Sequence, residues 1–398
     1  MTDMTAELHP LAWVAGSDAP EKSVLDLGFM ALSDAASLIV AATQGFAQPY
    51  GLTLNLHRQG SWAMLRDGLL GGQLDAAHCL YGLVYGVQLG IGGVPATDMA
   101  VLMGLCRNGQ AINLSAALQR DGVTSAEALR RLVLGQGARL TLAHTFPTGT
   151  HALWLYYWLA SLGIHPLRDV DTLVVPPAQM VEHLRAGRID GFCAGGPWGA
   201  LAIDEGMGFT VATSQSIWPD HPEKVLSATR AFVEECPNAA RALVMALLDA
   251  SRFIEASEAN LRGTARLISG SDYLDAPLAS IEPRLLGHYQ DGLGHAWKDA
   301  HPLRFHDAGR ANQPWLSDGL WFITQFRRWG LLRGEPDYLA IAGQVQQQAL
   351  YREAAQALGI AVDDLGLRSS TLLDGKHWDG TDPAGYARGF ALHALNDA

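Results

Sequence analysis

Two short stretches of this chain share the pattern L-x-x-G-x-[L/I]-D-[A/G], at residues 69–76 and 184–191. Each follows a helix-like segment and leads into a short apolar run typical of a buried strand. The glycine suits the left-handed position that often ends a helix. One copy alone would be an ordinary helix–strand junction, but two copies predict two similar α/β lobes. A cleft between lobes is the first place to look for a ligand.

Composition limits the classes of partner. The chain has 398 residues, of which 48% are hydrophobic and 17% charged, so it can bury a large core. Its formal net charge of −12 argues against direct binding to nucleic acid, which needs a basic surface. A small anionic ligand is still allowed, because it responds to the donors in its own pocket.

We expect a cytoplasmic protein with reduced thiols. The N-terminal residues include several acids, and the apolar run 11–15 is too short for a secretory signal. No stretch is long and apolar enough to span a membrane. The four cysteines have no C-x-x-C spacing, and Cys79 and Cys193 fall in predicted core strands, where cysteine acts as a small hydrophobe.

Apolar runs alternate with helical patterns along the first half of the chain, which predicts βαβ units and largely parallel sheets. The segments expected to be strands are 24–29, 52–57, 75–80, 139–144, 172–175 and 191–194, and the segment 209–213 is expected to lead back towards the first lobe. The segments expected to be helices are 35–43, 62–70, 151–162 and 178–186, and Ser61 suits the N-cap of the second of these.

The second half of the chain is predicted to be mainly helical, with helices expected at 222–235, 239–256 and 316–329. We divide the chain into a loose tail (1–23), a discontinuous first lobe (24–113 and 215–398) and a second lobe (114–214). Arg327 and Arg328 lie on an amphipathic helix, and we expect both to face solvent.

Loops that enter helices from the carboxyl ends of strands are natural anion sites, because free backbone N–H groups and the helix dipole meet there. Such loops occur at 33–34, 60–62, 148–151 and 175–177, and small residues dominate them. A further helix start is expected at 220–224, with Pro222 at its first position and Lys224 in its first turn.

Several motifs together resemble the nitrate/bicarbonate family of solute receptors. The resemblance implies a fold of the periplasmic-binding-protein type II class, with two α/β lobes and a ligand cleft between them. It covers most of the chain beyond Val24. The matching motifs lie at Leu32–Ala41, Ser61–Ala63, Asp75–His78, Gly109–Ile112, Gly149–Trp154, Val174–Met180, His221–Lys224 and Trp321–Gln325.

Without a signal sequence, the resemblance points to the cytoplasmic branch of this family, the nitrate/nitrite sensors of the NasS type. It implies a partner, an RNA-binding antiterminator of the NasT type, which is held without nitrate and released when nitrate binds. Exported members commonly carry Gly-Glu-Pro-Trp where this chain has Gly195-Gly196-Pro197-Trp198. A metal or second-ligand role for that glutamate is therefore not expected here.

The resemblance carries a nitrate site onto Trp62, Gln110, His151, Pro177 and Lys224, with Pro176 as the alternative proline. The chemistry suits a planar monoanion, which needs one positive charge and several modest donors. Because His151 begins a helix, the dipole should favour its neutral form. Each residue also has an ordinary structural role open to it: core packing for Trp62, a surface amide for Gln110, a polar helix start for His151 and a solvated lysine for Lys224.

We expect the anion to close the lobes, with Trp62, Gln110 and Lys224 on the first lobe or its hinge side and His151 and Pro177 on the second. Asp75 and Asp190 should be structural. No cofactor or metal is expected, and His301 and His306 lack supporting carboxylates. The main alternative is an exported transport receptor for nitrate, bicarbonate or a sulfonate. An enzyme resembling the thiamine-pyrimidine synthases is disfavoured, because clustered cysteines and a nucleophile–base pair are missing. The residues do not separate nitrate from nitrite.

Overall fold

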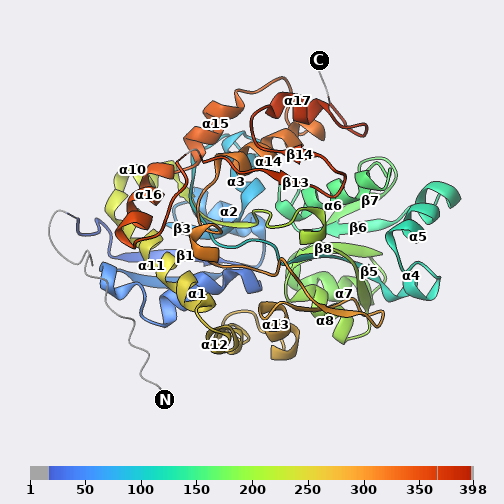
Figure 1. Ribbon diagram of the computed structural model, residues 1–398, viewed down its shortest axis with the longest axis horizontal. Coiled ribbons are helices and arrows are strands. Elements are labelled where there is room, and N and C mark those ends of the chain that lie inside the picture. Colours follow the sequence, from blue (N-terminus) through green and yellow to red (C-terminus); the bar gives the residue numbers. More distant parts are fainter. Residues whose placement is uncertain (1–17, 365, 396–398) are drawn as a thin grey trace.

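The computed structural model describes residues 18–364 and 366–395, and Figure 1 shows two α/β lobes side by side. Each lobe is built on a five-stranded sheet. The first sheet has the order β2-β1-β3-β10-β4, with β1 Val24–Phe29, β2 Thr53–Arg58, β3 Ala76–Leu80, β4 Met99–Gly104 and β10 Lys224–Thr229. The second has the order β7-β6-β8-β5-β9, with β5 Gln110–Ser115, β6 Thr141–His144, β7 Asp171–Val174, β8 Gly191–Gly195 and β9 Gly208–Thr213.

The two sheets have the same plan. β1 pairs in parallel with β2 and β3, and β6 pairs in parallel with β7 and β8. The strand that follows each crossover is antiparallel to its neighbours: β10 between β3 and β4, and β5 between β8 and β9. The chain therefore passes between the lobes twice, at residues 105–109 and 214–223, and both sheets are mixed rather than wholly parallel.

The repeated motif has the same local structure in both lobes. Gly72 and Gly187 adopt left-handed φ angles of 70° and 64° after α2 (Trp62–Leu70) and α7 (Met180–Arg185). In the first lobe the Asp75 backbone N–H donates to the Asp26 carbonyl at 2.8 Å, and the Asp26 N–H donates back to Asp75 Oδ2 at 2.8 Å.

Asp190 makes the matching pair of bonds with Thr141 in the second lobe, each also 2.8 Å long. Both aspartates lie 49 residues after the residue they hold. The predicted structural role of Asp75 and Asp190 is therefore confirmed.

Two predictions around the crossovers are wrong. Residues 222–235 were expected to form one helix, but they form strand β10 followed by α10 (Arg230–Glu235). The apolar, largely buried sequence of β10 pairs on both sides, and this tertiary pairing outweighs the helix start suggested by Pro222. The strand β5 was not predicted, and it places Gln110 in the second sheet rather than the first.

The C-terminal half contacts both lobes. α11 (Pro237–Glu255) packs on α1 (Ala36–Thr43) and α16 (Gln348–Ala357) of the first lobe. In contrast, α13 (Leu278–Leu285) packs on α8 (Trp198–Asp204) of the second lobe, and Tyr157 there donates to Asp374 of the tail at 2.9 Å. The segment 215–398 therefore contacts both lobes.

The remaining helices and strands complete these layers. They are α3 Tyr81–Gln88, α4 Ala116–Arg120, α5 Ala126–Arg130, α6 Thr150–Ser161, α9 Ser214–Ile217, α12 Glu258–Ile268, α14 Leu316–Arg328, α15 Tyr338–Val345, α17 Pro383–Arg388, β11 His288–Gln290, β12 Ala296–Lys298, β13 Ser370–Thr371 and β14 His377–Trp378. Within the described ranges, every helix is too short or too polar to cross a membrane.

Arg327 and Arg328 are buried, contrary to the prediction that they face solvent. The C-terminal segment covers Arg328: its guanidinium lies 3.6 Å from the ring centroid of Phe390 and donates to the Leu392 carbonyl. Arg327 donates to the Leu332 carbonyl at 3.0 Å. Residues 1–17 of the tail expected to be loose lie outside the described residues. Residues 18–23 are held to the fold, because Glu21 accepts backbone N–H bonds from Asn238 and Ala239 at the start of α11.

The lobes are in direct contact in this structure. The Ser33 N–H of the first lobe donates to the Gly196 carbonyl of the second at 2.8 Å. Nearby, α3 lies against Thr148: a Cβ atom added to Gly82 would be 2.2 Å from the Thr148 carbonyl oxygen, and one added to Gly86 would be 2.6 Å from Thr148 Oγ1. The structure therefore shows the closed arrangement of the lobes.

Candidate functional site

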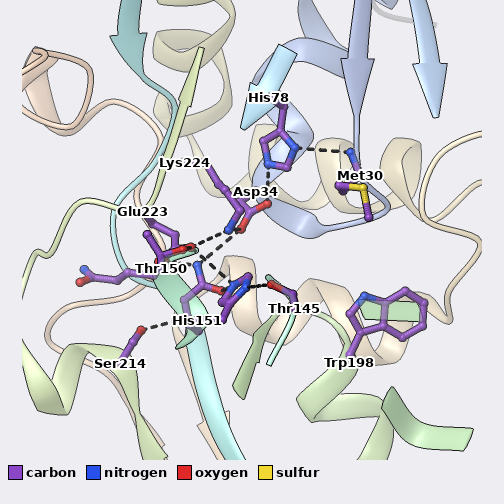
Figure 2. Close-up of polar contacts among 12 residues, drawn as sticks. Met30, Asp34, His78, Thr145, Thr150, His151, Trp198, Ser214, Glu223 and Lys224 are labelled. Carbon is purple, nitrogen blue, oxygen red and sulfur yellow. Dashed lines mark hydrogen bonds and ion pairs between the residues drawn. The ribbon is translucent and has the colours of Figure 1, made fainter. Parts of the chain in front are cut away.

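Lys224 lies at the centre of a buried polar cluster between the lobes (Figure 2). It is the first residue of β10, so its side chain lies where the chain enters the first sheet from the second crossover. Its Nζ donates to Asp34 Oδ2 at 2.9 Å and to Glu223 Oε1 at 2.6 Å. An ammonium has three protons, so one is left for a further acceptor.

Burial alone would lower the pKa of Lys224, but Asp34 and Glu223 outweigh it and hold this pKa above its usual value. Burial would likewise raise the pKa of Asp34, but Lys224 and His78 keep that pKa low. For Glu223 burial wins and the pKa is raised, although Lys224, Thr150 and Trp154 all favour its charged form. Lys224 and Asp34 therefore stay charged, and Glu223 is the group that takes up a proton most readily.

His151 links this cluster to Gln110. Gln110 Nε2 donates to the Asn108 carbonyl at 3.1 Å, which leaves Gln110 Oε1 to accept from His151 Nε2 at 3.3 Å. His151 Nδ1 then accepts from the Thr145 hydroxyl at 2.6 Å. The lowered pKa of His151 makes the ring neutral, as predicted, so Nδ1 is the acceptor in this pair. Burial and then Lys224 lower the pKa of His151, rather than the helix dipole we invoked.

Trp62 supplies an unpaired donor. It opens α2 directly after Ser61, whose hydroxyl accepts the Met64 N–H at 3.2 Å and so caps the helix as predicted. The ring is buried, and its centroid lies 5.8 Å from Lys224 Nζ. The indole N–H is itself buried and has no partner among the described residues. A buried donor left unpaired is costly, which suits a position that meets a ligand.

Two acidic residues and a histidine of this cluster were not predicted as site residues. Asp34 follows β1 and accepts from His78 Nε2 at 2.8 Å, while His78 Nδ1 accepts the Met30 N–H at 3.5 Å. Glu223 accepts from Trp154 Nε1 at 2.9 Å and from Thr150 Oγ1 at 2.6 Å, both on α6. The available signal was charge inside apolar sequence, since Asp34 is the only charged residue between Leu27 and Ala42.

The structure thus brings together Trp62, Gln110, His151 and Lys224. Pro177 is buried and Pro176 is half-buried at the start of the short helix before α7, and no described polar contact joins either to the cluster. A small cavity of about 30 Å³ borders Gln110, with Ser33 of the first lobe on one side and Gly196 and Pro197 of the second on the other. Trp62, His151 and Lys224 do not line it. A space of this size suits a ligand of only a few atoms.

The comparison with known proteins places this site in a family. Residues 18–269 match the model of the NMT1-like family. The chain belongs to this family. It is 35% identical over 394 residues to the nitrate/nitrite binding protein NrtA of a Synechocystis species, covering 96% of this chain and 88% of that protein.

Solved structures agree with this assignment. The crystal structure of the periplasmic nitrate-binding protein NrtA from Synechocystis superposes with a TM-score of 0.89 and 33% identity, covering 94% of this chain and all of that chain. The alkanesulfonate-binding protein SsuA from Xanthomonas axonopodis shares the fold alone, with a TM-score of 0.60 and 16% identity. The predicted periplasmic-binding-protein-like fold is therefore confirmed.

Some relatives are longer than this chain. The bicarbonate transport ATP-binding protein CmpC of Synechocystis is 36% identical over 380 residues, which is 94% of this chain but 56% of CmpC. The homologues matched over most of their own length are solute-binding proteins, which are not enzymes, so this chain is a binding protein rather than an enzyme.

Proposed function

We propose that this chain binds nitrate or nitrite between its lobes. The observation that carries the proposal is a pair of available donors in a closed, buried site: the third proton of Lys224 and the unpartnered indole N–H of Trp62. The full-length relatives named as nitrate/nitrite binding proteins support the choice of anion. Lys224 already donates two of its three protons to carboxylates. Such a lysine suits a weakly basic monoanion better than a multiply charged one.

The donors come from both lobes, so closure completes the site. Trp62 belongs to α2 of the first lobe, whereas Gln110 lies on β5 and His151 on α6 of the second. Lys224 follows the second crossover and contacts groups of both lobes. An anion bound by all of them favours the closed form in proportion to its greater affinity for that form.

We further propose that closure is the signal, and that the chain is a cytoplasmic sensor. A partner that prefers the open form, an RNA-binding antiterminator, would be released when nitrate closes the lobes. The resemblance to the cytoplasmic sensor branch and the glycine at position 196 support this role. The alternative is a transport receptor, which the similarity to a periplasmic nitrate-binding protein supports at least as well.

Calorimetry on the purified protein tests anion binding. We expect one nitrate per chain, and His151→Ala should weaken binding by about tenfold or more, because it removes the ring that holds Gln110 in place through Oε1. The exposed His288 provides the matched control His288→Ala, which should bind as the wild type does. No binding at millimolar nitrate would contradict the proposal.

The sensor and receptor roles are separated by two measurements. Fractionation of cells that express the native gene shows where the protein resides. A pull-down of a purified antiterminator, with and without nitrate, shows whether the anion releases it. Protein in the cytoplasm and release by nitrate support the sensor. An exported protein, or a complex unaffected by nitrate, would contradict the sensor role while leaving anion binding intact.

A further inference from the structure

A larger cavity, of about 580 Å³, opens beside the two crossovers between the lobes. None of the predicted nitrate-site residues lines it. Its walls come from the first crossover at Arg107, the second crossover at Pro219 and Asp220, the loop 300–310, Trp315 and the C-terminal residues 368–371. It is therefore a separate space on the hinge, built mainly by segments outside the two sheets.

The cavity gathers arginines on a chain whose net charge is −12. Arg107, Arg304, Arg310 and Arg368 all line it, against the carboxylates of Asp220 and Asp307. Burial lowers the pKa of Arg107 to about 10, and the next cause is repulsion from Arg368. Two guanidinium groups are thus held near each other at the cavity wall despite their repulsion.

The acids nearby leave part of this charge unpaired. Asp307 bonds Arg310 at 2.8 Å and lies 3.8 Å from Arg107, and Asp220 is bonded to His301 at 3.0 Å. Arg368 Nε donates to Asp318 at 2.7 Å, and its Nη2 has no partner among the described residues but is covered by protein rather than open to the cavity.

Arg304 strengthens this excess of donors. Its side chain is exposed, and within the described part of the chain it makes no ion pair. Its backbone pairs with that of Arg107 through N–H to carbonyl bonds of 2.9 and 3.1 Å, so the two arginines are fixed side by side. Arg304 therefore adds a positive charge that no described carboxylate neutralises to the lining of the cavity.

We propose that this cavity is a second anion site, which binds a small organic or inorganic polyanion through several carboxylate or phosphate groups. Guanidinium groups form paired hydrogen bonds with carboxylate and phosphate oxygens, and four of them surround one space. The hydroxyls of Ser369, Ser370 and Thr371 add neutral donors on the C-terminal wall. A volume of this size is typical of small-molecule sites and is far too large for nitrate alone.

Calorimetry with citrate and, separately, pyrophosphate tests the proposal and distinguishes carboxylate from phosphate ligands. The buffer contains about 0.15 M salt, so that diffuse surface attraction is screened. We expect one saturable site for at least one probe. Arg304→Glu, and independently Thr371→Glu on the opposite segment, should weaken it by about tenfold or more.

Two controls define the site. Arg333→Glu makes the same charge change at an exposed arginine outside the cavity and should leave the affinity unchanged. His151→Ala should weaken nitrate but not the polyanion, so failure of the nitrate proposal and failure of this one are distinguishable. Thermal unfolding checks that each variant is folded.

The proposal is overturned if neither probe binds at millimolar concentration, or if both cavity variants bind as tightly as the wild type. It is also overturned if nitrate displaces the probe competitively, because the probe would then occupy the site between the lobes. Binding of polyglutamate without binding of either small probe would show a docking surface for an acidic polypeptide instead.

Discussion

The negative charge of Glu223 would repel an anion that enters the proposed site. Glu223 faces Lys224 beside it on the chain, Thr150, His151 and Trp154 on α6, and His221 before β10. Asp34 lies across Lys224 from it. Burial lowers the pKa of both histidines, that of His221 to about 3, so they stay neutral near pH 7. Glu223 is thus the titrating neighbour of a bound anion.

We predict that nitrate affinity falls as pH rises through the raised pKa of Glu223. A bound anion raises the pKa of Glu223 further, so above the pKa of the free protein nitrate binding is coupled to the uptake of a proton. In that pH range the nitrate affinity falls by at most about tenfold per pH unit. Glu223→Gln should bind nitrate more tightly at high pH and lose the dependence. Calorimetry in buffers of different ionisation enthalpy measures the proton; equal pH profiles for variant and wild type would contradict the prediction.

At the residue scale, the sequence predicted the proposed ligand donors but not the carboxylates that hold Lys224. Trp62, Gln110, His151 and Lys224 were found through a family resemblance, and the structure brings them together. Asp34 and Glu223 lay within the same motifs without a role, because a buried carboxylate is explained only by its partner. That partner, Lys224, is 190 residues from Asp34, a distance that no local pattern bridges.

At the scale of helices and strands, Asp75 and Asp190 of the repeated motif each accept a backbone N–H from the neighbouring strand. Asp190→Ala removes the acceptor of the Thr141 N–H in a partly buried place and should destabilise the protein by about 1–3 kcal/mol. Denaturant unfolding measures this loss. Asp121→Ala, at an exposed aspartate after α4, should change stability little, and nitrate affinity should survive in both variants. An unchanged stability of Asp190→Ala would refute the role.

The sequence predicted helices and strands correctly where their partners lie in the same lobe and close in sequence, and it failed near the crossovers between the lobes. The strands β1, β3 and β8 and the helices α2 and α14 were predicted within a residue or two. The strand β10 was taken for a helix because Pro222 suggested a helix start. Its pairing partners, β3 and β4, lie more than a hundred residues earlier, so local sequence does not specify the sheet that it joins.

At the scale of the whole molecule, the two lobes meet where Gly82 of α3 contacts Thr148, and only glycine fits there. In Gly82→Ala the new methyl group would meet the Thr148 carbonyl oxygen at 2.2 Å, so the lobes are held apart. We predict nitrate binding weaker by about tenfold or more and a larger radius of gyration in solution scattering. Helix α3 itself gains up to about 1 kcal/mol from alanine, so loss of binding would not reflect unfolding.

Gly263→Ala on α12 is the matched control, because an added Cβ there meets nothing within 4 Å. It should bind nitrate as the wild type does and keep the same scattering profile. If Gly82→Ala also behaved as the wild type, then either α3 shifts to accept the methyl group or the closed contact does not govern binding.

The contact of Gly82 and Gly86 with Thr148 also limits the size of the ligand that the closed lobes would accept. Gly82 lies against the Thr148 backbone and Gly86 against the Thr148 side chain, so this one residue of the second lobe limits how closely α3 approaches. We expect a flat anion to fit between the closed lobes, whereas a tetrahedral monoanion such as perchlorate would hold the lobes slightly apart. Selectivity between anions of equal charge would then come from the thickness of the anion, because the lack of side chains at Gly82 and Gly86 sets how closely the lobes approach.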